Sequence, residues 1–200
     1  MISRTLLIYA KPPRMGLSKT RLARGLGKTE AMRIARMCMG RTIRAATDQR
    51  WESVLYPAPD TYMGNTLGGL WPASLPRASQ GHGDLTDRMN KGFDEASAGA
   101  IVIVGTDIPD ISTALIWQAF QSLRGHDAVF GPAWDGGFWL FGMNKRSNTH
   151  TPFGNVRWSS PHAMEDVWSH LPDHMSVGLL PKLIDIDEAE DWHQWRAEKN

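Results

Sequence analysis

The sequence predicts an α/β fold in which helices cover both faces of a mostly parallel sheet. Short apolar runs typical of buried strands alternate with segments whose apolar residues recur at helical spacing. This alternation favours a parallel sheet, because a crossover between parallel strands usually carries a helix. The 200 residues show no internal repeat, low-complexity tract or linker, so we expect one domain spanning 1–200.

The first part of the chain predicts two strands, a basic loop and a helix. Thr5 to Ala10 is β-prone, the basic loop runs from Lys11 to Arg21, and Ser53 to Tyr56 is a second strand. The stretch 57–83 is dense in Pro and Gly and is expected to be a long loop or a partly mobile lid. Thr29 can cap a helix whose apolar face is Ala31, Ile34, Ala35, Cys38, Thr42 and Ala45.

The remaining elements follow from capping residues and apolar runs. Asp84, with Asp87 three residues later, begins a helix that carries Leu85, Met89 and Phe93 on one side. A strand at 100–104 precedes a helix from about Ser112 to Leu123. The later expected elements are β runs at 127–132 and 138–143, a helix starting at Ser160-Pro161, a strand at 183–186 and a closing helix at 188–199.

Composition excludes several classes of function. The 22 basic and 21 acidic residues leave a net charge of +1, so no global field attracts nucleic acid or an anionic membrane. Cys38 is the only cysteine, which excludes an internal disulfide and cysteine-rich metal sites and fits a reducing cytosol. The apolar stretch at 5–10 is too short for a signal peptide or a membrane span. We therefore expect a cytoplasmic protein.

Asp107 is the first candidate site residue. It follows the apolar strand at 100–104 within the sequence Gly-Thr-Asp-Ile-Pro-Asp. Ligands of open α/β sheets gather at the carboxyl ends of strands, where a carboxylate can hold a cation that neutralises phosphates. The alternative is that Asp107 only caps the turn that Pro109 favours. The sequence alone does not separate these two roles.

The basic loop at 11–21 predicts a phosphate site. Lys11, Arg14, Lys19 and Arg21 lie between the first strand and the first helix, where backbone N–H groups already favour an anion. The loop is not a Walker P-loop, because Ser18 stands where the glycine before Lys-Ser/Thr is required. A solvated basic loop is the alternative. Which of Lys19 and Arg21 contacts phosphate is left open by spacing.

Two further groups of residues are candidates. Asp185 and Asp187 would share one face of a regular strand, about 6 to 7 Å apart, and could frame a cation with Asp107. Alternatively, Asp187 and Glu190 resemble a capping box for the last helix. Asp135, Gly136 and Gly137 are typical of a hairpin turn and could also form a pocket rim. Arg88 is ambiguous between a surface ion pair and a ligand contact, and Trp158 between packing and stacking on a base or sugar.

Taken together, these segments resemble the bacterial glycosyltransferase-A-like transferases called radical-SAM/selenodomain-associated transferases. This family is distantly similar to 2-phospholactate guanylyltransferase and molybdenum cofactor guanylyltransferase. The ordered matches, which cover nearly the whole chain, are Lys-Thr-Arg-Leu at 19–22, Gly-Asp-Leu-x-x-Arg-Met at 83–89, Gly-Thr-Asp-Ile-Pro at 105–109, Gly-Pro-Ala-x-Asp-Gly-Gly-Phe-Trp-Leu at 131–140, Val-Arg-Trp-Ser at 156–159 and Asp-Ile-Asp-x-x-x-Asp at 185–191.

The resemblance implies a three-layer α/β/α nucleotide-diphospho-sugar transferase fold. It also implies that the basic loop, with Lys19 and Arg21, cradles nucleotide phosphates and that Asp107 and Asp187 hold a divalent ion, Mg²⁺ or Mn²⁺. Arg14-Met15 resembles the Arg-Met of sugar-nucleotide pyrophosphorylases, but Lys11-Pro12-Pro13 replaces their glycine-rich loop. Thr86 and Phe138 stand where this family commonly has glycine and tyrosine.

The expected function is a metal-dependent transferase that uses a nucleoside triphosphate or a nucleotide-sugar and a small-molecule acceptor. Lys19 and Asp107 are the expected catalytic residues, Lys11, Arg14, Lys19, Arg21 and Arg88 would bind the nucleotide, and Asp135, Gly136, Gly137 and Trp158 would bind the substrate. The clustered basic loop favours nucleotidyl over glycosyl transfer. A non-catalytic nucleotide-sensing or partner-binding module on the same fold is the alternative. The sequence predicts no oligomeric state.

Overall fold

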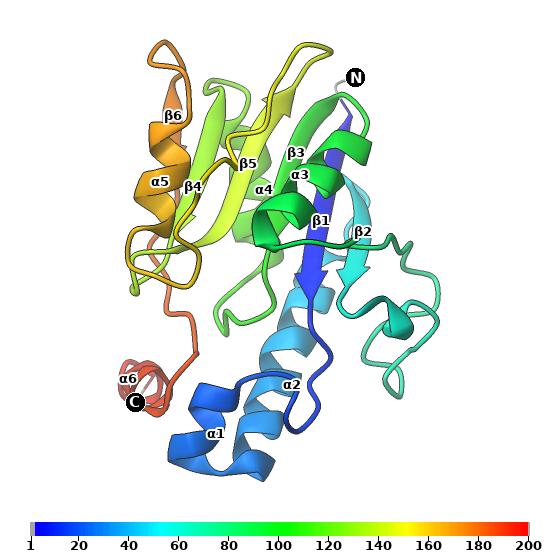
Figure 1. Cartoon of the computed structure of the whole chain (residues 1–200), viewed down its shortest axis with the longest axis vertical. Coiled ribbons are helices and arrows are strands. Elements are labelled where there is room, and N and C mark those ends of the chain that lie inside the picture. The colour runs from blue at the N-terminus through cyan, green and yellow to red at the C-terminus, as the bar shows by residue number, and fades with distance from the viewer. Residues whose placement is uncertain (1–2, 200) are drawn as a thin grey trace.

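The computed structural model describes residues 3–199 and contains a six-stranded sheet with the order β2-β1-β3-β5-β4-β6 (Figure 1). The strands are β1 (Arg4–Ala10), β2 (Glu52–Pro57), β3 (Gly99–Val104), β4 (Ala128–Pro132), β5 (Phe138–Lys145) and β6 (Val177–Leu179). The helices are α1 (Thr20–Leu26), α2 (Lys28–Ala46), α3 (Leu85–Glu95), α4 (Thr113–Ser122), α5 (Ala163–Ser169) and α6 (Ala189–Ala197), with a short 3₁₀ turn, η1 (Asp60–Tyr62).

The sheet is mostly parallel, as the sequence predicts. β1 pairs in parallel with β2 and β3, and β6 pairs in parallel with β4. β5 is antiparallel to both of its neighbours, because the short turn after β4 returns the chain directly beside it. Gly136 takes the positive φ of 87° that this turn needs, which confirms the predicted hairpin.

Helices cover both faces of the sheet, which confirms the three-layer arrangement. On one face, Leu6 and Ile8 of β1 pack with residues of α2 and α4, including Ile43 and Phe120. On the other face, Leu7 packs with residues of α3 and α5. Alternate residues of a strand point to opposite faces, so β1 contributes to both cores. In the described part of the chain, no helix is both long and apolar enough to cross a membrane.

A third core lies beyond the end of β1. Leu22 of α1 and Ile34 and Cys38 of α2 pack there with Trp192 and Trp195 of α6. In Figure 1, α1, α2 and α6 lie together beyond the arrowhead of β1. This core fixes the basic loop and the C-terminal segment against each other at the edge of the sheet where parallel strands end.

Several predicted boundaries are wrong. The expected strand at 183–186 is reduced to a single bridge between Leu183 and Ala133, and the sixth strand lies earlier, at Val177–Leu179. The helix expected from Ser160 begins at Ala163 after a turn. α2 is capped by Gly27 rather than Thr29. By contrast, the capping box of α3, Asp84 with Asp87, is confirmed.

The long segment after β2 is irregular, as predicted, but it is packed onto the molecule. The Trp71 side chain is completely buried in the core beside α2. The Arg77 guanidinium donates hydrogen bonds to the carbonyl oxygens of Met63, Trp71 and Pro72. These contacts tie together two parts of the loop, and the loop's role as a lid stays a prediction.

Candidate functional site

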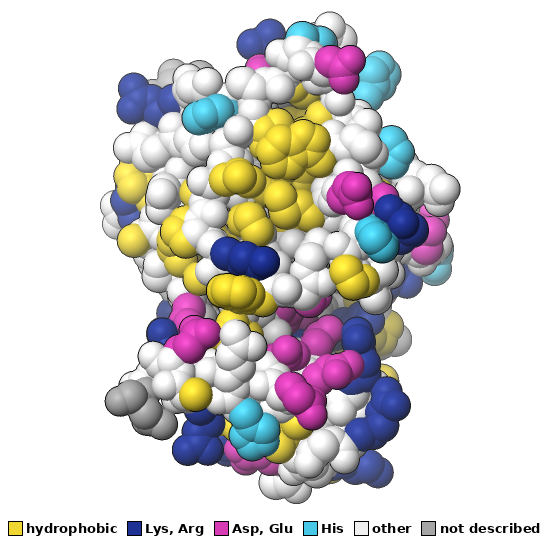
Figure 2. Space-filling model, turned by 90° about the vertical axis from the view of Figure 1, so that its left-hand side faces the viewer, with side chains coloured by type: hydrophobic (Ala, Val, Ile, Leu, Met, Phe, Trp, Pro, Cys, Tyr) yellow, Lys and Arg dark blue, Asp and Glu magenta, His cyan; other side chains and the backbone are white. Residues whose placement is uncertain are grey.

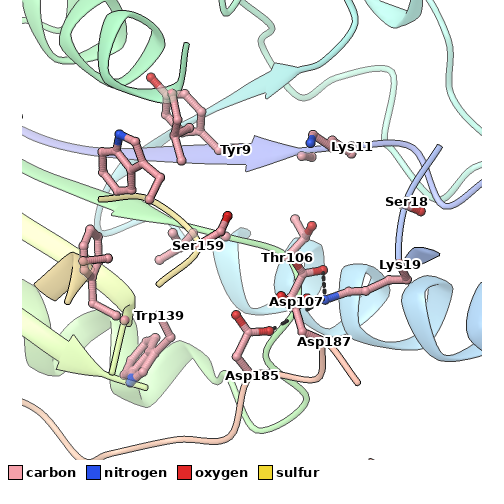
Figure 3. A pocket seen from close by; sticks show the side chains of 18 of the residues that line it. Tyr9, Lys11, Ser18, Lys19, Thr106, Asp107, Trp139, Ser159, Asp185 and Asp187 are labelled. Carbon is pink, nitrogen blue, oxygen red and sulfur yellow. Dashed lines mark hydrogen bonds and ion pairs between the residues drawn. The ribbon is translucent and has the colours of Figure 1, made fainter. Parts of the chain in front are cut away.

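A cavity of about 630 Å³ lies at the carboxyl ends of β1 and β3 (Figure 3). The end of β1 contributes Tyr9 and Lys11, and the loop after β3 contributes Thr106 and Asp107. Loops that lie far apart in sequence complete its wall, among them 17–21 and 158–160. Because parallel strands end at the same edge of a sheet, this is the expected place for a ligand in an open α/β fold.

Three carboxylates meet at one side of this cavity. Asp107 follows β3, and its carbonyl oxygen accepts a hydrogen bond of 3.2 Å from the Ile186 amide. That main-chain contact brings the 185–187 segment beside the loop after β3. One carboxylate oxygen from each of Asp107, Asp185 and Asp187 lies within 4.8 Å of the others. Figure 3 shows the three side chains converging from two segments.

The Lys19 ammonium lies among the three carboxylates. Its Nζ atom is 2.6 Å from Asp187, 3.1 Å from Asp107 and 3.7 Å from Asp185. Lys19 is the residue before α1 and adopts a left-handed backbone with φ of 53°, and its side chain is only 5% exposed. A non-glycine residue in this region is strained, so the fold holds Lys19 in position against a local cost.

The protonation of the cluster follows from burial and mutual charge. Burial disfavours the charged ammonium, but the three carboxylates outweigh it and raise the pKa of Lys19. Burial raises the pKa of Asp185 to about 8, with Asp107 and Asp187 adding to the rise and Lys19 opposing it. Burial opposes ionisation of Asp187, but Lys19 and Arg21 together outweigh it and lower the pKa of Asp187. Lys19 is therefore charged, and Asp187 is ionised at neutral pH.

The residues present fit a hard divalent cation. Asp185 Oδ1 is buried and has no hydrogen-bond partner in the described chain, and an oxygen so placed gains from a cation. Carboxylate oxygens are the ligands that Mg²⁺ and Mn²⁺ prefer. The Lys19 ammonium shows that a positive charge is stable at this point. Asp107, Asp185 and Asp187 could therefore hold such an ion.

Most predicted site residues line this one cavity. Besides Lys19, Asp107 and Asp187, these are Lys11, Arg21, Arg88, Asp135, Gly137 and Trp158. Arg21 NH2 lies 3.2 Å from Asp187 Oδ2, which places it next to the acidic cluster. Asp135 Oδ1 accepts a hydrogen bond of 2.9 Å from the Gly137 amide, so this carboxylate also shapes the hairpin turn.

Two predicted residues lie away from the cavity wall. The Arg14 guanidinium is 5.2 Å from the centre of the Tyr62 ring, in a cation–π contact with η1. Gly136 lines a separate shallow apolar hollow with Pro161, Met164 and Trp168. Their predicted contacts with nucleotide and substrate stay predictions.

The sequence pattern allowed Asp185 to frame a cation with Asp107, but the resemblance implied only Asp107 and Asp187 as ion ligands, and the predicted cap of α6 is wrong. The capping box of this helix is formed by Glu188 and Asp191, one residue later than the predicted pair Asp187 and Glu190. Because the Asp187 carboxylate does not cap α6, it is available to pair with the Lys19 ammonium. The Asp-x-Asp spacing was the signal for Asp185. Tyr9 and Ser159 also line the cavity, and nothing local in the sequence distinguishes them.

Comparisons with known proteins relate the chain to a family and to a fold. A family model described as "Uncharacterized protein conserved in bacteria (DUF2064)" matches residues 42–160. No curated protein matches the sequence significantly. The structure of a proposed nucleotide-diphospho-sugar transferase from Desulfovibrio desulfuricans G20 is 27% identical with a TM-score of 0.84, and the match covers 100% of this chain and 89% of that chain.

More distant structures share the fold. The 4-diphosphocytidyl-2C-methyl-D-erythritol synthase of Anaerococcus prevotii DSM 20548 is 10% identical with a TM-score of 0.64, covering 99% of this chain and 98% of that chain. The glucosyl-3-phosphoglycerate synthase of Mycobacterium tuberculosis, in complex with Mn²⁺, UDP and glucosyl-3-phosphoglycerate, is 8% identical with a TM-score of 0.58, covering 96% and 75%. The chain therefore has the nucleotide-diphospho-sugar transferase fold, related to glycosyltransferase A.

Proposed function

The chain belongs to the bacterial protein family DUF2064, and we propose that it is a metal-dependent transferase that uses a nucleoside triphosphate or a nucleotide-sugar. The observation that carries the proposal is the cluster of Asp107, Asp185 and Asp187 around Lys19 at the carboxyl edge of the sheet. Transferases are found among structures of this fold, and one of them contains Mn²⁺ and UDP. We propose that residues 1–200 form a single transferase domain. We also propose that the protein is cytoplasmic.

The proposed ion ligands are Asp107 and Asp187, as the resemblance implies, with Asp185 added from the geometry. When bound, Mg²⁺ or Mn²⁺ would neutralise phosphate charge and polarise a phosphoryl oxygen. Lys19, at the centre of the cluster, would keep Asp187 ionised and donate to a phosphate oxygen. Arg21 and Lys11 line the same side of the cavity and would bind the outer phosphates as charge-assisted donors.

We favour nucleotidyl transfer over glycosyl transfer because the basic residues gather on one side of the cavity, which suits three phosphates. In that reaction, an acceptor oxygen forms a bond to the α-phosphorus while the bond from that phosphorus to the bridging oxygen breaks. The bridging oxygen leaves with pyrophosphate and its electron pair. No protein nucleophile is needed, and positioning and electrostatic stabilisation would supply most of the rate. Asp135, Gly137 and Trp158 are proposed to contact the group that receives the nucleotide.

Product analysis tests the proposal. The purified protein would be incubated with Mg²⁺ or Mn²⁺, each common nucleoside triphosphate or nucleotide-sugar, and panels of phosphorylated compounds and sugars. Pyrophosphate release that requires both metal and acceptor supports nucleotidyl transfer, and nucleoside diphosphate release supports glycosyl transfer. Nucleotide binding without turnover across the panels supports the nucleotide-sensing alternative. A matched pair, Asp107→Asn at the cluster and Asp173→Asn at an exposed position, separates loss of the site from general damage. The resemblance to radical-SAM/selenodomain-associated transferases stays a prediction.

A further inference from the structure

The cavity has a second side that differs in charge from the acidic cluster. In Figure 3, Tyr9 and Ser159 stand apart from Lys19 and Asp107. The Tyr9 hydroxyl donates a hydrogen bond of 2.7 Å to the Arg88 carbonyl oxygen, so the first turn of α3 lies at the hydroxyl end of the Tyr9 side chain. Arg88, Trp158 and Ser159 line the cavity on this side. We call these three residues the Arg88 side.

Arg88 is a cation without a counter-ion. Within residues 3–199 its guanidinium makes no ion pair, and its buried Nε has no hydrogen-bond partner. Lys19 and Arg21, in contrast, are each paired with carboxylates of the acidic cluster. Arg88 is half-buried and lines the cavity, and a guanidinium with no carboxylate of the described chain within ion-pair distance is suited to bind a carboxylate or a phosphate of a ligand.

Trp158 and Ser159 give the Arg88 side a defined shape. The Trp158 indole donates a hydrogen bond of 2.8 Å to the Thr86 hydroxyl, two residues before Arg88, which fixes the ring beside the guanidinium's helix. Ser159 has a left-handed backbone with φ of 57° and is an exposed residue of the cavity wall. The described chain has three non-glycine residues with positive φ, and two of them, Lys19 and Ser159, line this cavity. Strain of this kind concentrates at functional sites.

We infer that the Arg88 side is the acceptor subsite and that the acceptor is a small molecule with an anionic group next to a flat or apolar part. This inference rests on the proposed function. The metal ion, Lys19, Arg21 and Lys11 suffice for the nucleotide phosphates, which leaves the Arg88 charge for a second anion. The acceptor's anionic group pairs with Arg88, its flat part contacts Trp158, and the Ser159 hydroxyl orients it. We therefore assign Arg88 to binding of the acceptor and not to binding of the nucleotide, which the sequence predicts.

Calorimetry with a simple probe tests the inference. A nucleoside triphosphate with Mg²⁺ is first titrated into the wild type, which tests the proposed function by itself. Phenyl phosphate, benzoate and phenol are then titrated into the protein with and without that nucleotide. Phenyl phosphate or benzoate should bind and phenol should not, and the comparison of the two acids tells a phosphate from a carboxylate acceptor.

Variants distinguish the subsite from a structural effect. Arg88→Gln should weaken binding of the anionic probe at least tenfold and change nucleotide affinity less than threefold, whereas Arg88→Lys should lose less. Arg36→Gln, at an exposed position of α2, is the control. Ser159→Ala and Ser159→Gly should lower the affinity for the anionic probe by the same factor, although only the glycine variant relieves the strained backbone.

Three results would overturn the inference. These are absence of probe binding by the wild type, an unchanged probe affinity in Arg88→Gln, and a loss of nucleotide affinity in that variant as large as the loss for the probe. The last result would return Arg88 to the nucleotide. If the wild type binds the probe but no nucleotide, the proposed function fails and the anion site at Arg88 stands.

Discussion

Replacing Lys19 with Met should destabilise the protein and at the same time make its stability depend on a divalent ion. The substitution keeps an unbranched side chain that is one heavy atom shorter, and it removes the ammonium that separates Asp107, Asp185 and Asp187. Their carboxyl oxygens lie within 4.8 Å of one another, so the groups would lose their shared counter-charge and those that are ionised would repel each other. A metal ion would relieve this repulsion, because it would no longer compete with a protein cation for the same oxygens.

The size of the loss follows from the geometry. At an effective dielectric constant of about 20, the ion pairs with Asp187 at 2.6 Å and Asp107 at 3.1 Å each contribute about 5 to 6 kcal/mol of attraction before desolvation is subtracted. Removing one partner of a buried pair typically costs about 3 to 5 kcal/mol. Lys19 is 5% exposed but the carboxylates are 25% to 43% exposed, so solvent screening reduces the expected net loss to about 2 to 4 kcal/mol. For a chain of this size, that loss lowers the melting temperature by roughly 4 to 16 °C.

The assay is thermal and urea unfolding of the wild type, Lys19→Met and Lys28→Met, with EDTA and with Mg²⁺ or Mn²⁺. Lys28 is exposed at the start of α2 and serves as the matched control. The metal should raise the melting temperature of Lys19→Met more than that of the wild type or the control. A Lys19→Met variant within about 1 kcal/mol of wild-type stability, or one insensitive to metal, would refute this reasoning.

Further predictions concern phosphate contacts, the α6 cap and Cys38. Arg21→Gln should weaken triphosphate binding roughly fivefold and leave nucleoside binding unchanged. The expected loss is only about 1 kcal/mol because the Arg21 side chain is 45% exposed. Equal losses for triphosphate and nucleoside, measured by calorimetry, would indicate a structural defect. Asp187→Asn should abolish metal-dependent nucleotide binding. Glu188→Ala should instead lower stability by about 1 kcal/mol and leave nucleotide binding intact. Loss of stability with retained nucleotide binding in Asp187→Asn would make Asp187 a helix cap. Burial raises the pKa of the Cys38 thiol to about 12. Between roughly pH 9 and 10, the folded state therefore keeps the thiol proton while the unfolded state releases it. The free energy of unfolding of the wild type, measured with urea, should fall by about 1 kcal/mol relative to that of Cys38→Ala over this range. Parallel pH profiles for the two proteins would contradict this prediction.

The strands and helices were largely predictable because their signals are local. The apolar run at 100–104 and the Asp84–Asp87 capping box were enough to predict β3 and the start of α3. The failures occur where tertiary contacts outweigh local pattern. Residues 184–187 alternate like a strand, yet only Leu183 finds a strand partner, and the Ile186 amide bonds to the loop after β3 instead.

The candidate site was predictable in residue type and only partly in geometry. Asp107 and the basic loop follow from position in an α/β chain, since both come at the ends of strands. The burial of Lys19 among three carboxylates depends on a left-handed residue and on packing of α1, α2 and α6, which no local pattern reveals. Ser159 and the unpaired state of Arg88 likewise depend on distant segments.

The most direct test of the central claim is the metal dependence of nucleotide binding in the wild type and in Asp107→Asn. Isothermal titration calorimetry would use the nucleoside triphosphate or nucleotide-sugar that most raises the melting temperature, with Mg²⁺ and with EDTA, and Asp173→Asn as control. We predict that Mg²⁺ strengthens binding at least tenfold, about 1.4 kcal/mol, in the wild type and the control and has no effect on folded Asp107→Asn. Equal metal dependence in Asp107→Asn, or no nucleotide binding by the wild type with any common divalent ion, would contradict the account.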